Sequence, residues 1–173
     1  VLETNKGTVK IKLDTVHAPL ASRNFARLVA KGSYDGTPFH RVLKGFMAQG
    51  GDFSQKPGGS ADRKEATFNG KPLRAEISDV KHTRGTLSMA RVGDPMQGNP
   101  QARMQLVQFI LQLEGKKVDE ATATAKLQEL TNAGFFRDRQ PFLDSGGSQF
   151  FLCFADTPGL DGGYTAFGKV VEG

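Results

Sequence analysis

The sequence has very little cysteine: Cys153 is the single one among 173 residues. One cysteine excludes an internal disulfide and any zinc site built from several cysteines. It lies in the apolar run 150–154, which favours a small buried residue over a reactive thiol. The three histidines, His17, His40 and His82, are far apart and lack the spacing of metal ligands, so we expect no metal.

Long apolar runs are missing as well, and so is a cationic leader followed by an apolar stretch. We therefore expect no membrane partner. A cytoplasmic location is slightly favoured, and the alternative is an exported protein whose leader was removed before Val1. The basic residues that give a formal net charge of +5 are scattered, so we expect no nucleic-acid partner. With 173 residues, 38% hydrophobic and 24% charged, the chain is typical of one soluble globular domain.

The motifs of nucleotide binding and of covalent hydrolysis are absent. No P-loop and no glycine fingerprint between a strand and a helix occurs, so no nucleotide or other cofactor is indicated. Ser148 lacks the second glycine of a nucleophile elbow and has no convincing histidine partner. Asp52, Asp161 and Glu172 lie beside turns or at the terminus and are interpreted as solvated or capping groups. The sequence therefore lacks the catalytic residues that a hydrolase requires.

What the sequence does contain is a series of short strands. Apolar residues alternate with polar ones and predict a strand over 7–14. A helix is predicted from Pro19, which suits a first turn, to a stop at Gly32. Further short apolar stretches, separated by glycine-rich turns, cover 39–43, 46–49, 86–90, 149–154 and 165–171. Many short strands with frequent turns favour a mainly β sandwich or a closed barrel.

The pattern turns helical between about Pro100 and Gly134. An apolar stripe over 104–113 predicts one helix, and Asp119 is placed to cap a second helix that Gly134 closes. These two helices form a predicted hairpin. We judge the hairpin too short to have a core of its own, and we expect its apolar faces to pack on the rest of the domain or on a partner.

One stretch is more specific than these patterns: residues 39–52 read FHRVLKGFMAQGGD. This stretch resembles the first signature of the cyclophilin family, and residues 147–152, GSQFFL, resemble the second. Further family motifs follow in the family order, namely LSMA at 87–90, LDG at 160–162 and FGKV at 167–170. The resemblance covers 1–92 and 145–173.

The resemblance implies a mainly β fold: a closed eight-stranded antiparallel barrel with capping helices, in a single domain over 1–173. Residues 93–144 then form a helical insertion, which replaces a short loop beside the peptide groove. The family normally continues past Gly173 with a further helix and a strand, whose absence indicates a shortened chain with open barrel edges. Two interpretations of the insertion stay open: a decoration packed on the barrel, or a hairpin that narrows or extends the groove and restricts which peptides enter.

The resemblance also implies a peptidyl-prolyl cis-trans isomerase that acts on proline-containing peptides and on unfolded or flexible protein segments. Arg41 is then the catalytic residue. The implied substrate-binding residues begin with Phe46, Met47, Phe151 and Leu160 around the proline ring. Gln49 and Gln149 hydrogen-bond the substrate backbone or hold neighbouring groups. The Ala90-Arg91 backbone lies beside the extended peptide, and Tyr164 stands where many members have histidine. We expect a monomer that assists protein folding.

These residue types suit that reaction. Rotation about an X-Pro bond faces a barrier of about 18–20 kcal/mol, because resonance gives the C–N bond double-bond character. No covalent bond forms or breaks, so no nucleophile, metal or cofactor is required. A guanidinium stays charged at any working pH, and its hydrogen bond to the proline nitrogen favours the twisted state.

Gly159 stands where many cyclophilins carry the tryptophan that contributes to cyclosporin binding, so we expect weak cyclosporin affinity and retained catalysis. The main alternative function is a noncatalytic proline-peptide binding or scaffold module that uses the helical insertion. Intact Arg41, Phe46 and Gln49 argue against it. A third possible function is a chaperone or scaffold that uses the basic surface. Salt-sensitive binding to acidic polymers would support this interpretation.

Overall fold

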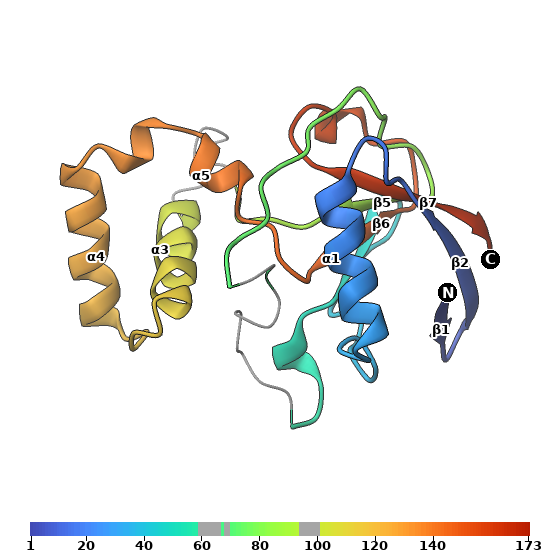
Figure 1. The fold of residues 1–173 in the computed structure, drawn as a ribbon, viewed down its shortest axis with the longest axis horizontal. Helices are drawn as coiled ribbons and strands as arrows, with labels where there is room; N and C mark the ends of the chain where they lie inside the picture. Colours follow the sequence, from blue (N-terminus) through green and yellow to red (C-terminus); the bar gives the residue numbers. More distant parts are fainter. Residues whose placement is uncertain (59–66, 68–69, 94–100) are drawn as a thin grey trace.

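A computed structural model describes residues 1–58, 67, 70–93 and 101–173 (Figure 1). One antiparallel sheet holds seven strands in the order β1-β2-β7-β5-β6-β4-β3. The strands are β1 (Leu2–Thr4), β2 (Gly7–Leu13), β3 (Arg41–Leu43), β4 (Met47–Gly50), β5 (Thr86–Met89), β6 (Phe150–Cys153) and β7 (Ala166–Glu172). The helices are α1 (Pro19–Ala30), α3 (Gln101–Leu113), α4 (Glu120–Asn132) and α5 (Gln140–Leu143), with 3-10 turns η1 (Phe53–Gln55), η3 (Phe135–Arg137) and η4 (Pro158–Leu160). None of the helices in these described ranges is long and apolar enough to span a bilayer.

The predicted strands and the first helix are confirmed, with small shifts at their ends. Strand β6 is buried along its whole length because both faces of the sheet are covered there. Its side chains alternate: Phe150 and Leu152 belong to the main core, while Phe151 and Cys153 belong to a second cluster. Cys153 is therefore buried as predicted, and burial raises the pKa of its thiol.

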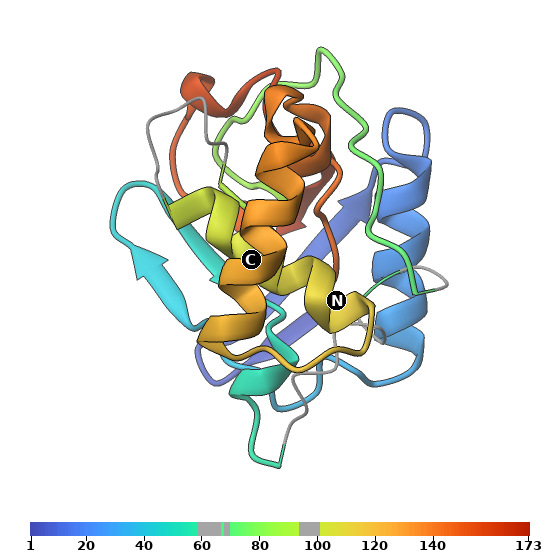
Figure 2. The same ribbon diagram turned by 90° about the vertical axis from the view of Figure 1, so that its left-hand side faces the viewer.

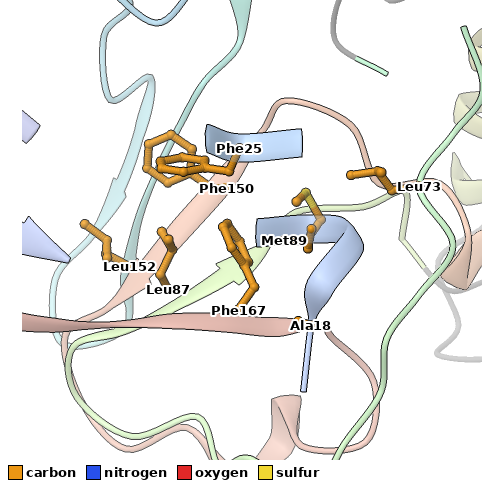
Figure 3. Packing of buried hydrophobic residues seen from close by; sticks show 9 residues of the cluster. Ala18, Phe25, Leu73, Leu87, Met89, Phe150, Leu152 and Phe167 are labelled. Atoms are coloured by element: carbon orange, nitrogen blue, oxygen red, sulfur yellow. The ribbon is translucent and has the colours of Figure 1, made fainter. Parts of the chain in front are cut away.

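Helix α1 covers the main core of the sheet (Figure 3). Phe25 lies in the middle of this core, and its ring meets those of Phe150 and Phe167 edge-on, at centroid distances of 5.3 and 5.5 Å. Pro19 begins the helix as predicted. Glu76, far along the chain, accepts hydrogen bonds of 2.9 Å from two amides in the first turn. The helix is thus fixed to the sheet by apolar packing and by a distant capping group.

The sheet is open rather than closed. Strands β1 and β3 are its edges, and no pairing joins them within the described ranges. Between β4 and β5 the described residues include the turn η1 and an isolated bridge from Leu73 to Gly146, and no further strand is formed among them. The mainly β fold is confirmed, and the closed eight-stranded barrel is not.

Helices α3 and α4 form the predicted hairpin, which stands beside the sheet (Figure 1). Asp119 caps α4 as predicted, because its Oδ1 accepts from the amide of Thr122 at 2.8 Å. Gly134 follows the helix in the left-handed conformation at φ +72°, which suits a residue without a side chain. In Figure 2, α4 lies in front of α3, so α3 separates α4 from the sheet.

The two helices of the hairpin do not form a core alone, because their apolar faces pack with the chain that follows them. Buried side chains of α3 and α4 pack with two phenylalanines that follow the hairpin in η3 and α5. The members of this helical cluster are Leu106, Val107, Phe109, Leu111, Ala123, Phe136 and Phe142. The chain that returns to the sheet therefore closes a core that two short helices alone do not complete.

Candidate active site

Three polar side chains form a line across neighbouring strands. Arg41 in β3 lies opposite Gln49 in β4, and its Nη1 is 3.5 Å from Gln49 Oε1. Gln49 Nε2 donates in turn to Gln149 Oε1 at 2.9 Å. The side-chain amide of Gln49 thus has partners on both sides. Arg41 itself is exposed, and the long contact to Gln49 is the one hydrogen bond that its side chain makes among the described residues.

An apolar cluster lies next to this line. Met47 lies in β4, the strand of Gln49, and Phe151 lies in β6, the strand that begins directly after Gln149. Its buried members are Met47, Phe151 and Cys153, and its partly buried members are Phe46, Ala90, Leu160 and Tyr164. The rings of Phe151 and Tyr164 meet edge-on with centroids 5.6 Å apart. Partly exposed apolar side chains around a buried floor suit a small hydrophobic ring of a ligand.

The segment Ala90-Arg91 is held in place from two sides. The amide of Ala90 donates to the carbonyl of Gln149 at 3.0 Å. The guanidinium carbon of Arg91 lies 4.2 Å from the ring centroid of Tyr164. Nε and Nη1 of the same arginine donate to two backbone carbonyls at 2.8 and 2.9 Å. These contacts fix the backbone that the resemblance places beside an extended peptide.

A buried hydrogen-bond network supports the apolar cluster. His82 is 1% exposed, with Nδ1 3.0 Å from Asp161 Oδ1 and Nε2 2.9 Å from Ser88 Oγ. The imidazole is stacked on the ring of Phe151 at a centroid distance of 6.2 Å. Ser88 is 0% exposed, so no substrate reaches its hydroxyl, and the trio does not act as a nucleophilic triad. The network instead fixes the position of Phe151.

This network was not predicted from the sequence, in which Asp161 was interpreted as a solvated or capping group. Its carboxylate does accept from the backbone amide of His82 at 2.9 Å, and this bond, with the ring contact, lowers the pKa of Asp161. The available signal was Ser88, a hydroxyl in the fully buried strand β5, which requires a hydrogen-bond partner. Asp52 fits its interpretation, because it caps η1.

A cavity of about 420 Å³ adjoins the site, between the sheet and the hairpin. On the site's side it is lined by Gln49, Ala90, Arg91 and Gln149. On the hairpin's side it is lined by Gln105, Gln108, Phe109 and Gln112 of α3. The sequence predicted that the helices border a groove, but the α3 side chains that face it were not identified.

All the residues that the sequence analysis selected therefore lie together. Three form the polar line, six belong to the apolar cluster, and Arg91 contacts the ring of Tyr164. Their roles in binding and catalysis stay predictions. Within the part of the chain that the structure describes, no three His, Cys, Asp or Glu side chains gather in a way that could hold a metal ion.

Comparison with known proteins gives one consistent result. The family model described as cyclophilin type peptidyl-prolyl cis-trans isomerase/CLD matches residues 1–122 and 132–173. A peptidyl-prolyl cis-trans isomerase of Helicobacter pylori is 32% identical over 174 residues, which cover 99% of this chain and 71% of that protein. The human peptidyl-prolyl cis-trans isomerase-like 1 is 33% identical, covering 99% of this chain and 72% of its own length.

A solved structure agrees with these relatives. A cyclophilin type peptidyl-prolyl cis-trans isomerase of Cryptosporidium parvum, crystallised in the presence of the dipeptide Ala-Pro, superposes with a TM-score of 0.64 at 27% identity. The match covers 99% of this chain and 77% of that one.

Proposed function

The chain belongs to the cyclophilin-type peptidyl-prolyl cis-trans isomerase family and is a peptidyl-prolyl isomerase, and we propose that Arg41 is its catalytic residue. The observation that carries this proposal is the position of Arg41, which is exposed and lies at one end of the polar line beside the apolar cluster. Its weak contact to Gln49 leaves most of its five N–H donors available for a substrate.

The proposed mechanism uses one hydrogen bond that forms only as the peptide bond twists. In the planar X-Pro amide the nitrogen lone pair is delocalised, so it is a poor acceptor. In the twisted state the nitrogen regains its lone pair, and a guanidinium N–H can donate to it. Because this interaction is stronger in the transition state than in the ground state, it lowers the barrier rather than only tightening binding.

The apolar cluster supplies the other half of the site. We propose that the proline ring rests on Met47 and Phe151, with Phe46, Leu160 and Tyr164 around it, and that substrates are proline-containing peptides or flexible protein segments. The related structure obtained with Ala-Pro supports this substrate class. Gln49 and Gln149, which hydrogen-bond each other at 2.9 Å, would orient their remaining amide atoms towards the substrate backbone.

We further propose that the chain is one domain over 1–173, in which 93–144 is a helical insertion, and that it acts as a monomer that assists protein folding. A noncatalytic binding module is not favoured, because the relatives carry the names of isomerases. The test of the catalytic assignment is the isomerisation rate of an Ala-Pro peptide with Arg41→Ala, in which we expect most of the acceleration to be lost.

Gly159 leads to a prediction about cyclosporin. A side chain at this position would meet no atom within 4 Å of its Cβ, so one side of the proposed pocket is open next to Leu160. Gly159→Trp should fill this space with an aromatic wall and raise cyclosporin affinity about tenfold, measured by isothermal titration calorimetry. Gly159→Ala is the matched control and should leave the weak affinity unchanged. Equal cyclosporin affinity in a folded Gly159→Trp protein would contradict the prediction.

A further inference from the structure

We propose that helix α3 is the specificity wall of the isomerase, and that its glutamines select an uncharged amide side chain, Gln or Asn, two or three residues before the proline. The inference rests on the proposed function, because it takes the apolar cluster as the proline site. It assigns a role to residues outside the cyclophilin signatures: Gln105, Gln108 and Gln112.

The first argument is continuity between the cavity and the proposed proline site. Gln49 and Gln149 line the cavity and also belong to the polar line that begins at Arg41. Ala90 lines the cavity and also packs against the apolar cluster. A peptide whose proline rests on that cluster therefore needs to extend past these shared residues to reach the cavity. Because each extended residue advances by only about 3.3 Å, we assign the cavity to the side chain two or three residues before the proline.

The second argument is that α3 is held as a fixed wall. Val107 and Leu111 are buried in the helical cluster, and α4 covers the side of α3 that faces away from the sheet. Gln105, Gln108 and Gln112 are spaced three and four residues apart, so they share one face of the helix. That face lines the cavity. Packing on one side of α3 thus presents three amides on the other.

The third argument concerns the chemistry of the ligand. Gln112 Oε1 is buried and accepts no hydrogen bond in the described structure. A buried carbonyl oxygen without a donor is unfavourable, so a ligand that brings an N–H group is favoured at this point. Amide side chains of Gln and Asn provide both an N–H donor and a carbonyl acceptor, which matches the mixed donors and acceptors of the three glutamines.

Charge in the cavity favours a neutral ligand over an ion. Among the described residues that line the cavity, the charged ones are Asp52 and Arg91, which carry opposite signs. Asp52 Oδ1 already accepts from the amide and the hydroxyl of Ser54 at 3.1 and 2.7 Å. The guanidinium of Arg91 lies over the ring of Tyr164 and donates to two carbonyls. Neither charge is directed at an entering ion, so an uncharged polar side chain fits best.

The experiment compares peptides that differ in one side chain of nearly equal size. Peptides with Gln, Met, Lys or Glu two residues before an Ala-Pro bond, and a second set with the substitution three residues before, are titrated into 15N-labelled protein. Dissociation constants come from chemical-shift changes, and kcat/KM from NMR exchange spectroscopy on the same samples. We expect the wild type to bind the Gln peptide about tenfold more tightly than the Met peptide in one of the two sets, the effect of one satisfied hydrogen bond.

Gln112→Met keeps the shape of the side chain and removes its amide, so the Gln-to-Met affinity ratio should fall close to one. Gln128→Met, on the outer helix α4, is the matched control and should keep the wild-type ratio. Equal wild-type affinities in both sets, a preference for Lys or Glu, or an unchanged ratio in a folded Gln112→Met protein would each overturn the inference. Each of these outcomes would overturn the inference while the wild type still isomerises the Ala-Pro bond. Failure of the proposed function would instead appear as no catalysis of any peptide by the wild type. The dissociation constants would then still show which side chain the cavity prefers.

Discussion

Replacing Arg41 with alanine should lower kcat/KM for isomerisation of an Ala-Pro peptide by about 10²- to 10³-fold, the typical cost of removing one donor that stabilises a transition state. In the proposed mechanism the guanidinium donates to the twisted proline nitrogen, and the neighbouring glutamines lack a charge to replace it. The loss should appear in kcat more than in KM, because the hydrogen bond forms as the amide twists. NMR exchange spectroscopy at several peptide concentrations separates the two constants.

The fold should not change in this variant. Arg41 is exposed, and its 3.5 Å contact to Gln49 is weak, so the free energy of unfolding should change by less than about 0.5 kcal/mol. Arg41→Lys is the matched control: it keeps the charge but loses the planar fork, so we expect a rate between those of the wild type and Arg41→Ala. An alanine variant that retains more than about half of the wild-type kcat/KM would remove Arg41 from the mechanism.

The second large effect concerns stability. Phe142→Ala should lower the free energy of unfolding of the helical segment by about 3–5 kcal/mol, because it removes a fully buried ring from a small core. The ring of Phe142 lies 6.0 Å from that of Phe136, between centroids, so both lose packing partners. Hydrogen exchange of the α3 and α4 amides measures this change directly.

The helical cluster is separate from the core under α1, so the effect of Phe142→Ala should be uneven. Amides of β5 and β6 should keep most of their protection, while those of α3 and α4 lose theirs. Val118→Ala, in the exposed link between the two helices, is the control and should change stability by less than about 0.5 kcal/mol. A loss below about 1 kcal/mol for α3 and α4 in Phe142→Ala would show that the hairpin does not depend on its own core.

Local patterns in the sequence predicted the elements well because each element depends on residues close together. Alternation predicted β2, and Asp119 with Gly134 predicted both ends of α4. Closure of the sheet depends on pairing between distant strands, which no local pattern specifies, so the closed eight-stranded barrel rested on the resemblance and is not confirmed. The partners of the hairpin's apolar faces were not identified for the same reason, since Phe136 and Phe142 lie beyond both helices and join them only in three dimensions.

The candidate site divides in the same way. The residues of the two signatures were selected from motifs in the sequence, and the structure places them together. The buried partners of His82 were missed, because a histidine, a serine and an aspartate at 82, 88 and 161 give no spacing that marks them as neighbours. The α3 glutamines were missed because a glutamine on a helix is usually solvated, and only the cavity distinguishes Gln112 from Gln128.

The most direct test of the central claim is a crystal structure of this chain with a peptide that contains Ala-Pro. We predict that the proline ring rests on Met47 and Phe151, with an Arg41 guanidinium nitrogen within about 3 Å of the proline nitrogen or reaching it by a change of rotamer alone. A proline ring bound away from the apolar cluster, or an Arg41 that no rotamer brings to the proline nitrogen, would contradict the account.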